Sequence, residues 1–85
     1  MKVLIPSALR SYTESGQTEA KGATLDEVLV DLDRQYPGIR FRIIDEQQKV
    51  RRHIRIFVNG LSTEVLSQTM RPDDDVVIVQ ALSGG

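Results

Sequence analysis

A short apolar stretch at the start of the chain predicts a β-strand. From Lys2 to Ile5, Val3 and Ile5 fall on one face at a period of two. A second strand is expected around Gln17 to Lys21, after the break at Ser15-Gly16. We expect these two strands to pair as an N-terminal hairpin with a long turn.

A second group of strands is predicted in the C-terminal half. Ile54 to Val58 is the clearest strand, and Asn59-Gly60 directly after it is a strong hairpin signal. Pro72-Asp73-Asp74 predicts a turn. The apolar run Val76 to Val79 is typical of a strand in the middle of a sheet, and we expect it to pair beside the first strand.

Between these two groups lies one predicted amphipathic helix, from Thr24 to Tyr36. Thr24 and Glu27 have the spacing of a capping box, and Pro37-Gly38 ends the helix. Its apolar positions recur at helical spacing: Leu25, Val28, Leu29, Leu32 and Tyr36. A single apolar helix face can be buried against only one side of a sheet.

The segment after the helix is expected to be irregular. Isoleucine and phenylalanine alternate with arginine over residues 39–43, and a polar stretch follows from Asp45 to Lys49. The order of elements predicts an α+β fold in which one main helix packs on one face of a mixed sheet.

The composition limits the classes of function. The chain has 85 residues, 11 Lys+Arg, 12 Asp+Glu, a net charge of -1 and no cysteine. This size predicts a single domain over residues 1–85, and the near-zero charge gives no general attraction to nucleic acid or membrane. Without cysteine there is no disulfide scaffold, iron–sulfur cluster or thiol nucleophile. With no signal peptide or apolar span, we expect a soluble cytoplasmic domain.

Two polar features could hold a metal but fit other roles better. His53 is the single histidine, among Arg51, Arg52 and Arg55, so we expect it in a solvated loop or strand start. The run Asp73 to Asp75 lacks the alternate ligand spacing of a calcium loop. It is interpreted as a turn and strand cap, and no metal site and no catalytic residue is predicted.

Residues 40–55 carry a local excess of positive charge. Six cations stand against Asp45 and Glu46: Arg40, Arg42, Lys49, Arg51, Arg52 and Arg55. Three interpretations remain open: a solvated sheet edge, a surface for an acidic protein, or a nucleic-acid site. Few aromatic residues are interleaved for base stacking, so nucleic acid is the least favoured of the three.

One face of the sheet is expected to remain uncovered, because only one helix is available. If Val77 and Val79 face the helix, Val76 and Ile78 point to the open side, together with Phe57 and its neighbour Arg55. An aromatic side chain beside aliphatic ones on an open face is typical of a partner-binding surface. The alternative is that the loop over residues 61–74, or another copy, covers it.

The chain ends in Leu82, Ser83, Gly84 and Gly85, which we expect to form a flexible tail over residues 82–85. Glycine fits where a Cβ would clash and takes any backbone conformation that a narrow tunnel imposes. A terminal carboxylate without a neighbouring side chain is also an unhindered nucleophile towards the α-phosphate of ATP.

Several motifs together resemble the MoaD/ThiS-type sulfur carrier proteins, which have the ubiquitin-like β-grasp fold. They are Ile5-Pro6 with Leu9-Arg10, Gly22-x-Thr24-Leu25, Phe57-Val58-Asn59-Gly60, Asp73-x-Asp75-x-Val77-x-Val79 and Ser83-Gly84-Gly85. Within the family, Tyr36 to Arg40 and Ile43 to Arg52 are most similar to the CysO-like carriers. Asp74 stands where the family usually has glycine, and we expect the turn to be kept because Asp tolerates left-handed backbone angles.

The resemblance implies that Gly85 is adenylated and then converted to a thiocarboxylate that donates sulfur. The implied partners are a ubiquitin-activating-type enzyme that uses ATP, a sulfur-accepting synthase that receives Leu82, Ser83 and Gly84 with the acyl group, and a metalloprotease that trims or recycles the tail. The chain itself would bind no cofactor and would be a carrier rather than an enzyme. Cysteine synthesis is favoured over molybdopterin, thiamin or a dedicated pathway.

Two other classes of function remain open. A ubiquitin-like modifier would form an isopeptide bond between Gly85 and lysines, and a β-grasp binding module would have an inert tail. The three hypotheses predict different chemical states of Gly85: a thiocarboxylate for the sulfur carrier, a lysine adduct for the modifier and an unmodified carboxylate for the binding module.

Overall fold

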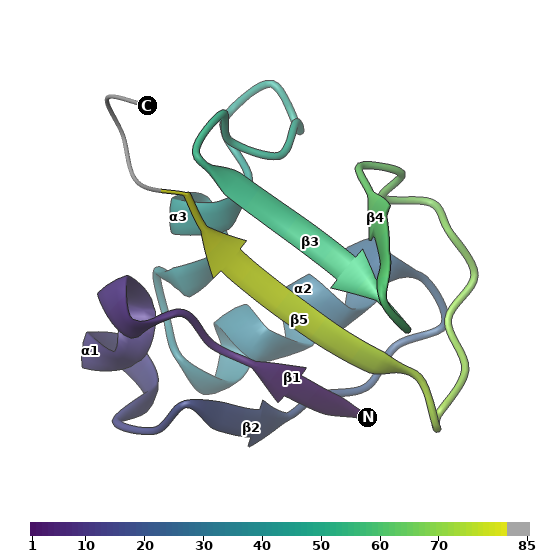
Figure 1. Ribbon diagram of the computed structural model, residues 1–85, viewed down its shortest axis with the longest axis horizontal. Coiled ribbons are helices and arrows are strands. Elements are labelled where there is room, and N and C mark those ends of the chain that lie inside the picture. The colour runs from purple at the N-terminus through teal and green to yellow at the C-terminus, as the bar shows by residue number, and fades with distance from the viewer. Residues whose placement is uncertain (82–85) are drawn as a thin grey trace.

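The chain folds into a five-stranded mixed sheet with its longest helix across one face (Figure 1). The structure is a computed structural model and describes residues 1–81. The strands are β1 (Lys2–Leu4), β2 (Gln17–Glu19), β3 (Ile54–Val58), β4 (Leu61–Thr63) and β5 (Asp75–Gln80). The helices are the 3-10 turn η1 (Ser7–Leu9), α1 (Arg10–Thr13), α2 (Leu25–Gln35) and α3 (Ile39–Ile43). No helix among these residues is long and apolar enough to span a membrane.

The last strand lies at the centre of the sheet, as the apolar run predicted. The strand order is β2-β1-β5-β3-β4, and β5 pairs in parallel with β1 and antiparallel with β3. β1 and β2 form the predicted N-terminal hairpin, while η1 and α1 occupy its long turn. The α+β class and the β-grasp arrangement of one main helix on a mixed sheet are therefore confirmed.

The predicted capping box starts α2. The backbone N–H of Glu27 donates to the hydroxyl of Thr24 at 3.2 Å, and the Glu27 carboxylate accepts from the backbone N–H of Ala23 at 3.1 Å. The first bond satisfies an amide group that the first helical turn leaves without a partner, and the second holds the residue that precedes the N-cap. At the other end the N–H of Tyr36 bonds to the carbonyl of Leu32 at 2.9 Å, so the predicted boundaries are confirmed.

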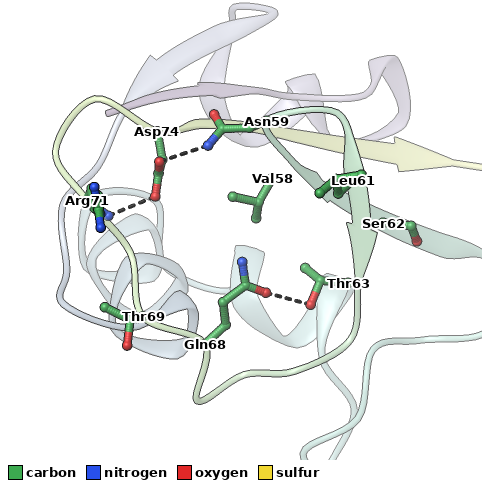
Figure 2. Close-up of a pocket in the computed structure, with 9 residues that line it drawn as sticks. All are labelled: Val58, Asn59, Leu61, Ser62, Thr63, Gln68, Thr69, Arg71 and Asp74. Atoms are coloured by element: carbon green, nitrogen blue, oxygen red, sulfur yellow. Dashed lines mark hydrogen bonds between the residues drawn. The ribbon is translucent and has the colours of Figure 1, made fainter.

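The β3–β4 hairpin turns at Asn59-Gly60, where both residues have positive φ angles of 51° and 86°. The Asn59 side chain also joins the hairpin to the turn before β5 (Figure 2). Its amide donates to the carboxylate of Asp74 at 2.8 Å, and its carbonyl oxygen accepts from the N–H of Asp75 at 2.9 Å. Asp74 further accepts from the N–H of Arg71 at 2.8 Å.

Asp74 therefore keeps the turn, but not for the reason that we expected. It is absent from the non-glycine residues with positive φ, which are Glu14, Gln48 and Asn59. The turn is held by the Asp74 carboxylate, which accepts one hydrogen bond from the N–H of Arg71 and another from the Asn59 side chain of the hairpin. Such side-chain bonds are common for Asp in turns. The interpretation of the acidic run as a turn and strand cap is confirmed.

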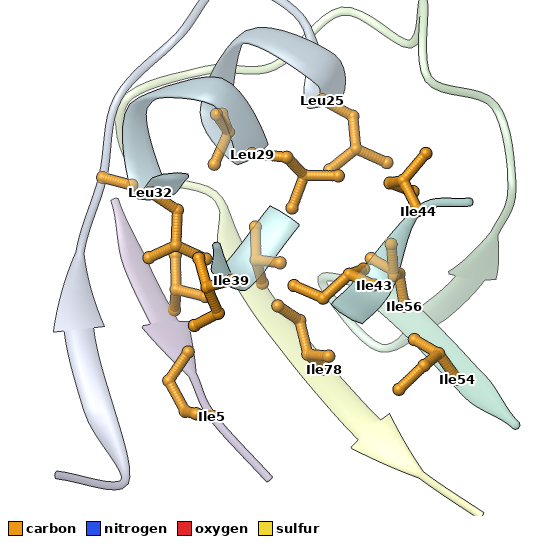
Figure 3. Packing of buried hydrophobic residues seen from close by; sticks show 14 of the residues in the cluster. Ile5, Leu25, Leu29, Leu32, Ile39, Ile43, Ile44, Ile54, Ile56 and Ile78 are labelled. Atoms are coloured by element: carbon orange, nitrogen blue, oxygen red, sulfur yellow. The ribbon is translucent and has the colours of Figure 1, made fainter. Parts of the chain in front are cut away.

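The core lies between the sheet and its two larger helices (Figure 3). From α2, the predicted apolar positions Leu25, Val28, Leu29 and Leu32 are all buried, and Tyr36 packs against them. From the sheet, the inward side chains come from alternate positions: Val3, Ile54, Ile56, Val58, Val76 and Ile78. None of the polar or charged residues in the described part of the chain is buried.

The segment after α2 is helical rather than irregular, so this prediction was wrong. In α3, Ile39 and Ile43 are both buried, whereas Phe41 is 55% exposed. The alternation over residues 39–43 also places isoleucines four positions apart, which is the spacing of one helix face. Asp33 fixes the start of α3 by accepting from the N–H groups of Gly38 and Arg40 at 3.1 and 3.0 Å.

Replacing Leu29 should test this account of the core. Leu29 is 0% exposed, so Leu29→Ala should lower the free energy of unfolding by about 2–5 kcal/mol through the cavity it leaves. The neighbouring Val30 is 51% exposed, and Val30→Ala should change the free energy of unfolding by about 0.5 kcal/mol or less. Urea unfolding of the three proteins measures both values, and equal effects would mean that the helix face is wrongly assigned.

Candidate functional site

The candidate site is the end of β5, where the chain leaves the sheet. β5 ends at Gln80, which pairs with Ile54, and the N–H of Ala81 donates to the carbonyl of His53 at 2.7 Å. The predicted tail residues Leu82, Ser83, Gly84 and Gly85 lie outside the described residues. The pairing of β5 with β1 ends at Val77, so the point from which the tail begins is held from the β3 side, through Gln80 and Ala81.

The uncovered face of the sheet was predicted correctly at β3 and wrongly at β5. Phe57 is half-buried and Arg55 exposed on the open face, as expected. Val76 and Ile78, however, are 0% and 2% exposed and belong to the core. Residues directly opposite each other in paired strands share a face, and Ile56 pairs with Ile78 and Val58 with Val76.

The open face instead carries the other residues of β5. Val77 pairs with Phe57 and with Leu4, and Val79 pairs with Arg55. Leu4 and Val79 are 36% and 38% exposed. These four side chains, Leu4, Phe57, Val77 and Val79, form an apolar strip across β1, β5 and β3, which we call the open-face strip.

Arg55 extends this strip towards the end where the tail begins. One nitrogen of its guanidinium donates to the carbonyls of Arg52 and Ile54, at 2.8 and 3.0 Å. Carbonyl acceptors orient the group without neutralising it. Arg55 therefore presents a positive charge beside an apolar surface.

Arg40 does not belong to the positively charged surface predicted over residues 40–55. Its guanidinium donates to the carboxylate of Asp26 at 2.6 Å and to the amide oxygen of Gln48 at 2.8 Å. The ion pair links the start of α2 to α3, and the Arg40 side chain is only 20% exposed. This arginine has a structural role.

One hollow lies away from the end of β5. It has a volume of about 420 Å³ and lies between the β3–β4 hairpin and the loop that leads to β5 (Figure 2). Its polar groups bond to one another: the hydroxyl of Thr63 donates to Gln68 at 2.7 Å, and Asn59 and Arg71 donate to Asp74. Because Asp74 precedes β5 and the tail follows it, this hollow cannot serve a reaction at the tail.

His53 and the acidic run were the other candidates for a metal site. Within residues 1–81, no group of three His, Asp or Glu side chains is placed to hold a metal ion. His53 is exposed and lines a small hollow of about 240 Å³ with Phe41, Arg42 and Arg51. The part of His53 that contacts Ala81, the residue directly before the tail and here called the tail root, is its backbone carbonyl.

Comparison with known proteins gives consistent matches along nearly the whole chain. A model described as the ThiS family matches residues 3–85. The sulfur carrier protein CysO of Mycobacterium tuberculosis is 34% identical over 89 residues, which cover 98% of this chain and 96% of that protein.

Solved structures agree with the sequence matches. The BexX/CysO complex of Amycolatopsis orientalis contains a chain with 33% identity and a TM-score of 0.89, covering 99% of this chain and 98% of that one. SAMP1 of Haloferax volcanii has a TM-score of 0.79 over 100% of this chain and 98% of that one. Its identity is 22%, so the likeness supports the fold alone.

The turn at Asp74 should give a pH-dependent contribution to stability. The hydrogen bond from the N–H of Arg71, and then that from the Asn59 amide, lower the pKa of the Asp74 carboxyl below its usual value. A lowered pKa in the folded state gives stability that is present above the pKa of the unfolded chain, about 3.9. This stability is lost as the pH falls through the folded-state pKa.

Asp74→Asn should therefore unfold at a lower urea concentration than the wild type at pH 7, and the difference should shrink below about pH 4. Asp73→Asn is the matched control, because the Asp73 carboxylate makes no hydrogen bond within residues 1–81. The pKa of Asp31 is also lowered, mainly by its hydrogen bond from Arg34, but Asp31 is unchanged in all three proteins. A difference that stays constant from pH 7 to pH 2 would contradict the assignment.

Proposed function

Because the chain belongs to the ThiS family and is a sulfur carrier protein, we propose that the carboxylate of Gly85 is the group that carries the sulfur. The observation that supports this most directly is the family match, which reaches the last residue, Gly85. The structure adds that β5 ends at Gln80 and that the bond from Ala81 to His53, just after the strand, lies four positions before Gly85. The final glycines have no side chains to hinder entry into a partner's active site.

The chemistry proceeds in two steps, both at Gly85. In the first, a carboxylate oxygen attacks the α-phosphorus of ATP, pyrophosphate leaves, and an acyl-adenylate forms. In the second, sulfide (HS⁻) attacks the acyl carbon, a C–S bond forms and AMP leaves, which gives the thiocarboxylate and releases a proton. The chain is a carrier and not a catalyst, and ATP is bound by the activating enzyme rather than by this protein.

The partners follow from these steps. A ubiquitin-activating-type enzyme adenylates the tail, and a sulfur-accepting synthase consumes the thiocarboxylate. A metalloprotease that trims or recycles the tail is the third proposed partner. The similarity to CysO favours a cysteine-type pathway, and the use of ATP favours the cytoplasm. That the CysO of Amycolatopsis orientalis was solved in a complex with BexX supports a role in which the carrier docks onto other proteins.

The open-face strip is the surface that we propose for docking. It lies on β1, β5 and β3, and β5 is the strand from which the tail continues. A protein that receives the tail must therefore approach the strands around β5. An apolar patch with an aromatic centre and a charged rim, here Arg55, has the composition of a binding hot spot.

Loss of the last two glycines should abolish function without affecting the fold. A chain that ends at Ser83 should keep the melting temperature of the wild type, because the described core involves residues before 82 only. It should form no acyl-adenylate with the activating enzyme and ATP. Mass spectrometry of wild-type protein from cells should show a thiocarboxylate, whereas lysine adducts through Gly85 would favour a protein modifier. Normal adenylation of the truncated chain would contradict the proposal.

Replacing Phe57 should weaken docking more than folding. Phe57→Ala should reduce affinity for the activating enzyme by about 2 kcal/mol or more, as expected for an aromatic hot spot. Leu61→Ala is the control, because Leu61 is 75% exposed and pairs with the inward-facing Val58. Titration calorimetry and thermal melts of each protein separate the two effects. Unchanged affinity together with a large drop in melting temperature would place Phe57 in the core instead.

A further inference from the structure

Four arginines gather around the root of the tail without any carboxylate partner in the described structure. They are Arg42, Arg51, Arg52 and Arg55, which we call the tail-root cluster. Within residues 1–81, ion pairs of arginine side chains involve only Arg34 and Arg40, with Asp31 and Asp26 respectively. Arg10 and Arg71 are also without an ion pair there, but they do not adjoin one another, whereas the four arginines of the cluster lie on one stretch of surface near the end of β5.

Two of the four guanidinium groups are held in place by neutral groups. Arg51 lies over the ring of Phe41, 4.5 Å from its centre, and its Nε donates to the Phe41 carbonyl at 2.7 Å. Arg55 is held by the carbonyls of Arg52 and Ile54. Such contacts reduce the freedom that each side chain would lose on binding, and they leave other N–H donors available for a carboxylate.

The other two cluster members and their surroundings complete the surface. The side chains of Arg42 and Arg52 are exposed and make no hydrogen bond within residues 1–81. Arg42 and Arg51 line one small hollow with His53, and Arg52 and Arg55 line another. Glu64 borders the second hollow without forming an ion pair, and Asp45 is occupied by the N–H groups of Gln47 and Lys49.

The cluster surrounds the residue to which the tail root is bonded. His53 separates Arg52 from Ile54 along the chain, and its carbonyl accepts the N–H of Ala81 at 2.7 Å. Gly85 is four residues further on, and four residues span at most about 14 Å. Any protein whose active site receives Gly85 must therefore bring its surface close to these arginines.

Charge along β5 is divided between its two ends, although the net charge is only -1. Asp73, Asp74 and Asp75 stand at the beginning of the strand, and the arginines of the tail-root cluster stand around its end. A molecule with this asymmetry is oriented by the field of an acidic surface, so that its positive end arrives first. A nucleic acid fits less well, because Phe41 is the exposed aromatic here and Arg51 already covers one face of its ring.

We propose that the tail-root cluster docks onto a carboxylate-rich surface around the entrance of the site that receives the tail on the activating enzyme. This inference rests on the proposed function and adds the chemistry of the partner surface. The open-face strip supplies apolar contact, while the cluster orients the carrier so that Gly85 enters the site. Carboxylates suit this role because guanidinium groups bind them through two parallel hydrogen bonds.

The test uses the full chain in ATP–pyrophosphate exchange catalysed by the activating enzyme of the same organism. Arg42→Gln/Arg52→Gln removes two cluster charges whose side chains make no hydrogen bond within residues 1–81, so folding should be unaffected. Lys21→Gln/Arg71→Gln removes the same charge from exposed positions near the opposite end of β5. Thermal melts of all three proteins check the folding.

The cluster variant should raise the KM for the carrier about tenfold at low ionic strength, with kcat unchanged, because charge complementarity acts on association. The control variant should behave as wild type, and the difference should shrink at about 0.5 M salt, where charges are screened. Equal KM values for both variants would overturn the inference alone. No exchange with the wild type would overturn the proposed function and this inference with it.

A fluorescent single-stranded oligonucleotide serves as a second probe. One outcome would overturn the inference: the wild type binds the oligonucleotide, the cluster variant does not, and the two proteins have the same KM in the exchange assay. The arginines would then bind nucleic acid. A raised KM in the cluster variant without oligonucleotide binding by the wild type supports an acidic protein surface.

Discussion

The parallel pairing of β1 with β5 is the constraint on which the rest of the structure depends. Two parallel neighbours cannot be joined by a tight turn, so the chain between them must cross from one end of the sheet to the other. Here that connection includes α2 and α3, which bury their apolar residues on one face. Because both helices are used on that face, the other face remains open. The same pairing places the last strand at the centre, so the tail continues from the central strand of the sheet.

This arrangement separates stability from chemistry. The core consists of apolar side chains, and none of the polar residues in the described part of the chain is buried with them. Changes at the tail or on the open face therefore leave no unpaired polar group inside the protein, which would cost stability. In the proposed function, the described body would position the tail, and the chemistry would take place at Gly85, outside this core.

The sequence predicted the elements whose signals are local. Thr24 and Glu27 mark the helix start, and Asn59-Gly60 marks the hairpin, because capping and tight turns involve residues only a few positions apart. The face of β5 could not be predicted in this way. Four consecutive apolar residues from Val76 to Val79 fit either face, and only the pairing of Ile56 with Ile78 decides between them.

The errors at α3 and around the arginines have the same long-range origin. The start of α3 is fixed by the Asp33 carboxylate, which accepts hydrogen bonds from the N–H groups of Gly38 and Arg40. Asp33 lies five and seven positions before these residues, a spacing that no short capping pattern reveals. The positive charge over residues 40–55 was visible in the sequence. Which of these side chains are neutralised inside the protein and which remain exposed was not. Arg40 is neutralised by Asp26, fourteen residues away, while Arg51 is held by the ring of Phe41. Only the folded chain shows which charges remain for a partner.

The position of the tail also limits how the carrier works with several partners. Gly85 is four positions after Ala81, so every active site that receives Gly85 must come within about 14 Å of the same strand end. Two enzymes cannot both receive the single Gly85 at the same time. In the proposed function, activation and sulfur donation would then occur in turn on overlapping surfaces. The carrier would have to leave the activating enzyme before binding the acceptor, which favours contacts that form quickly and dissociate readily. Exposed charges around a small apolar strip meet this requirement better than a large apolar interface would.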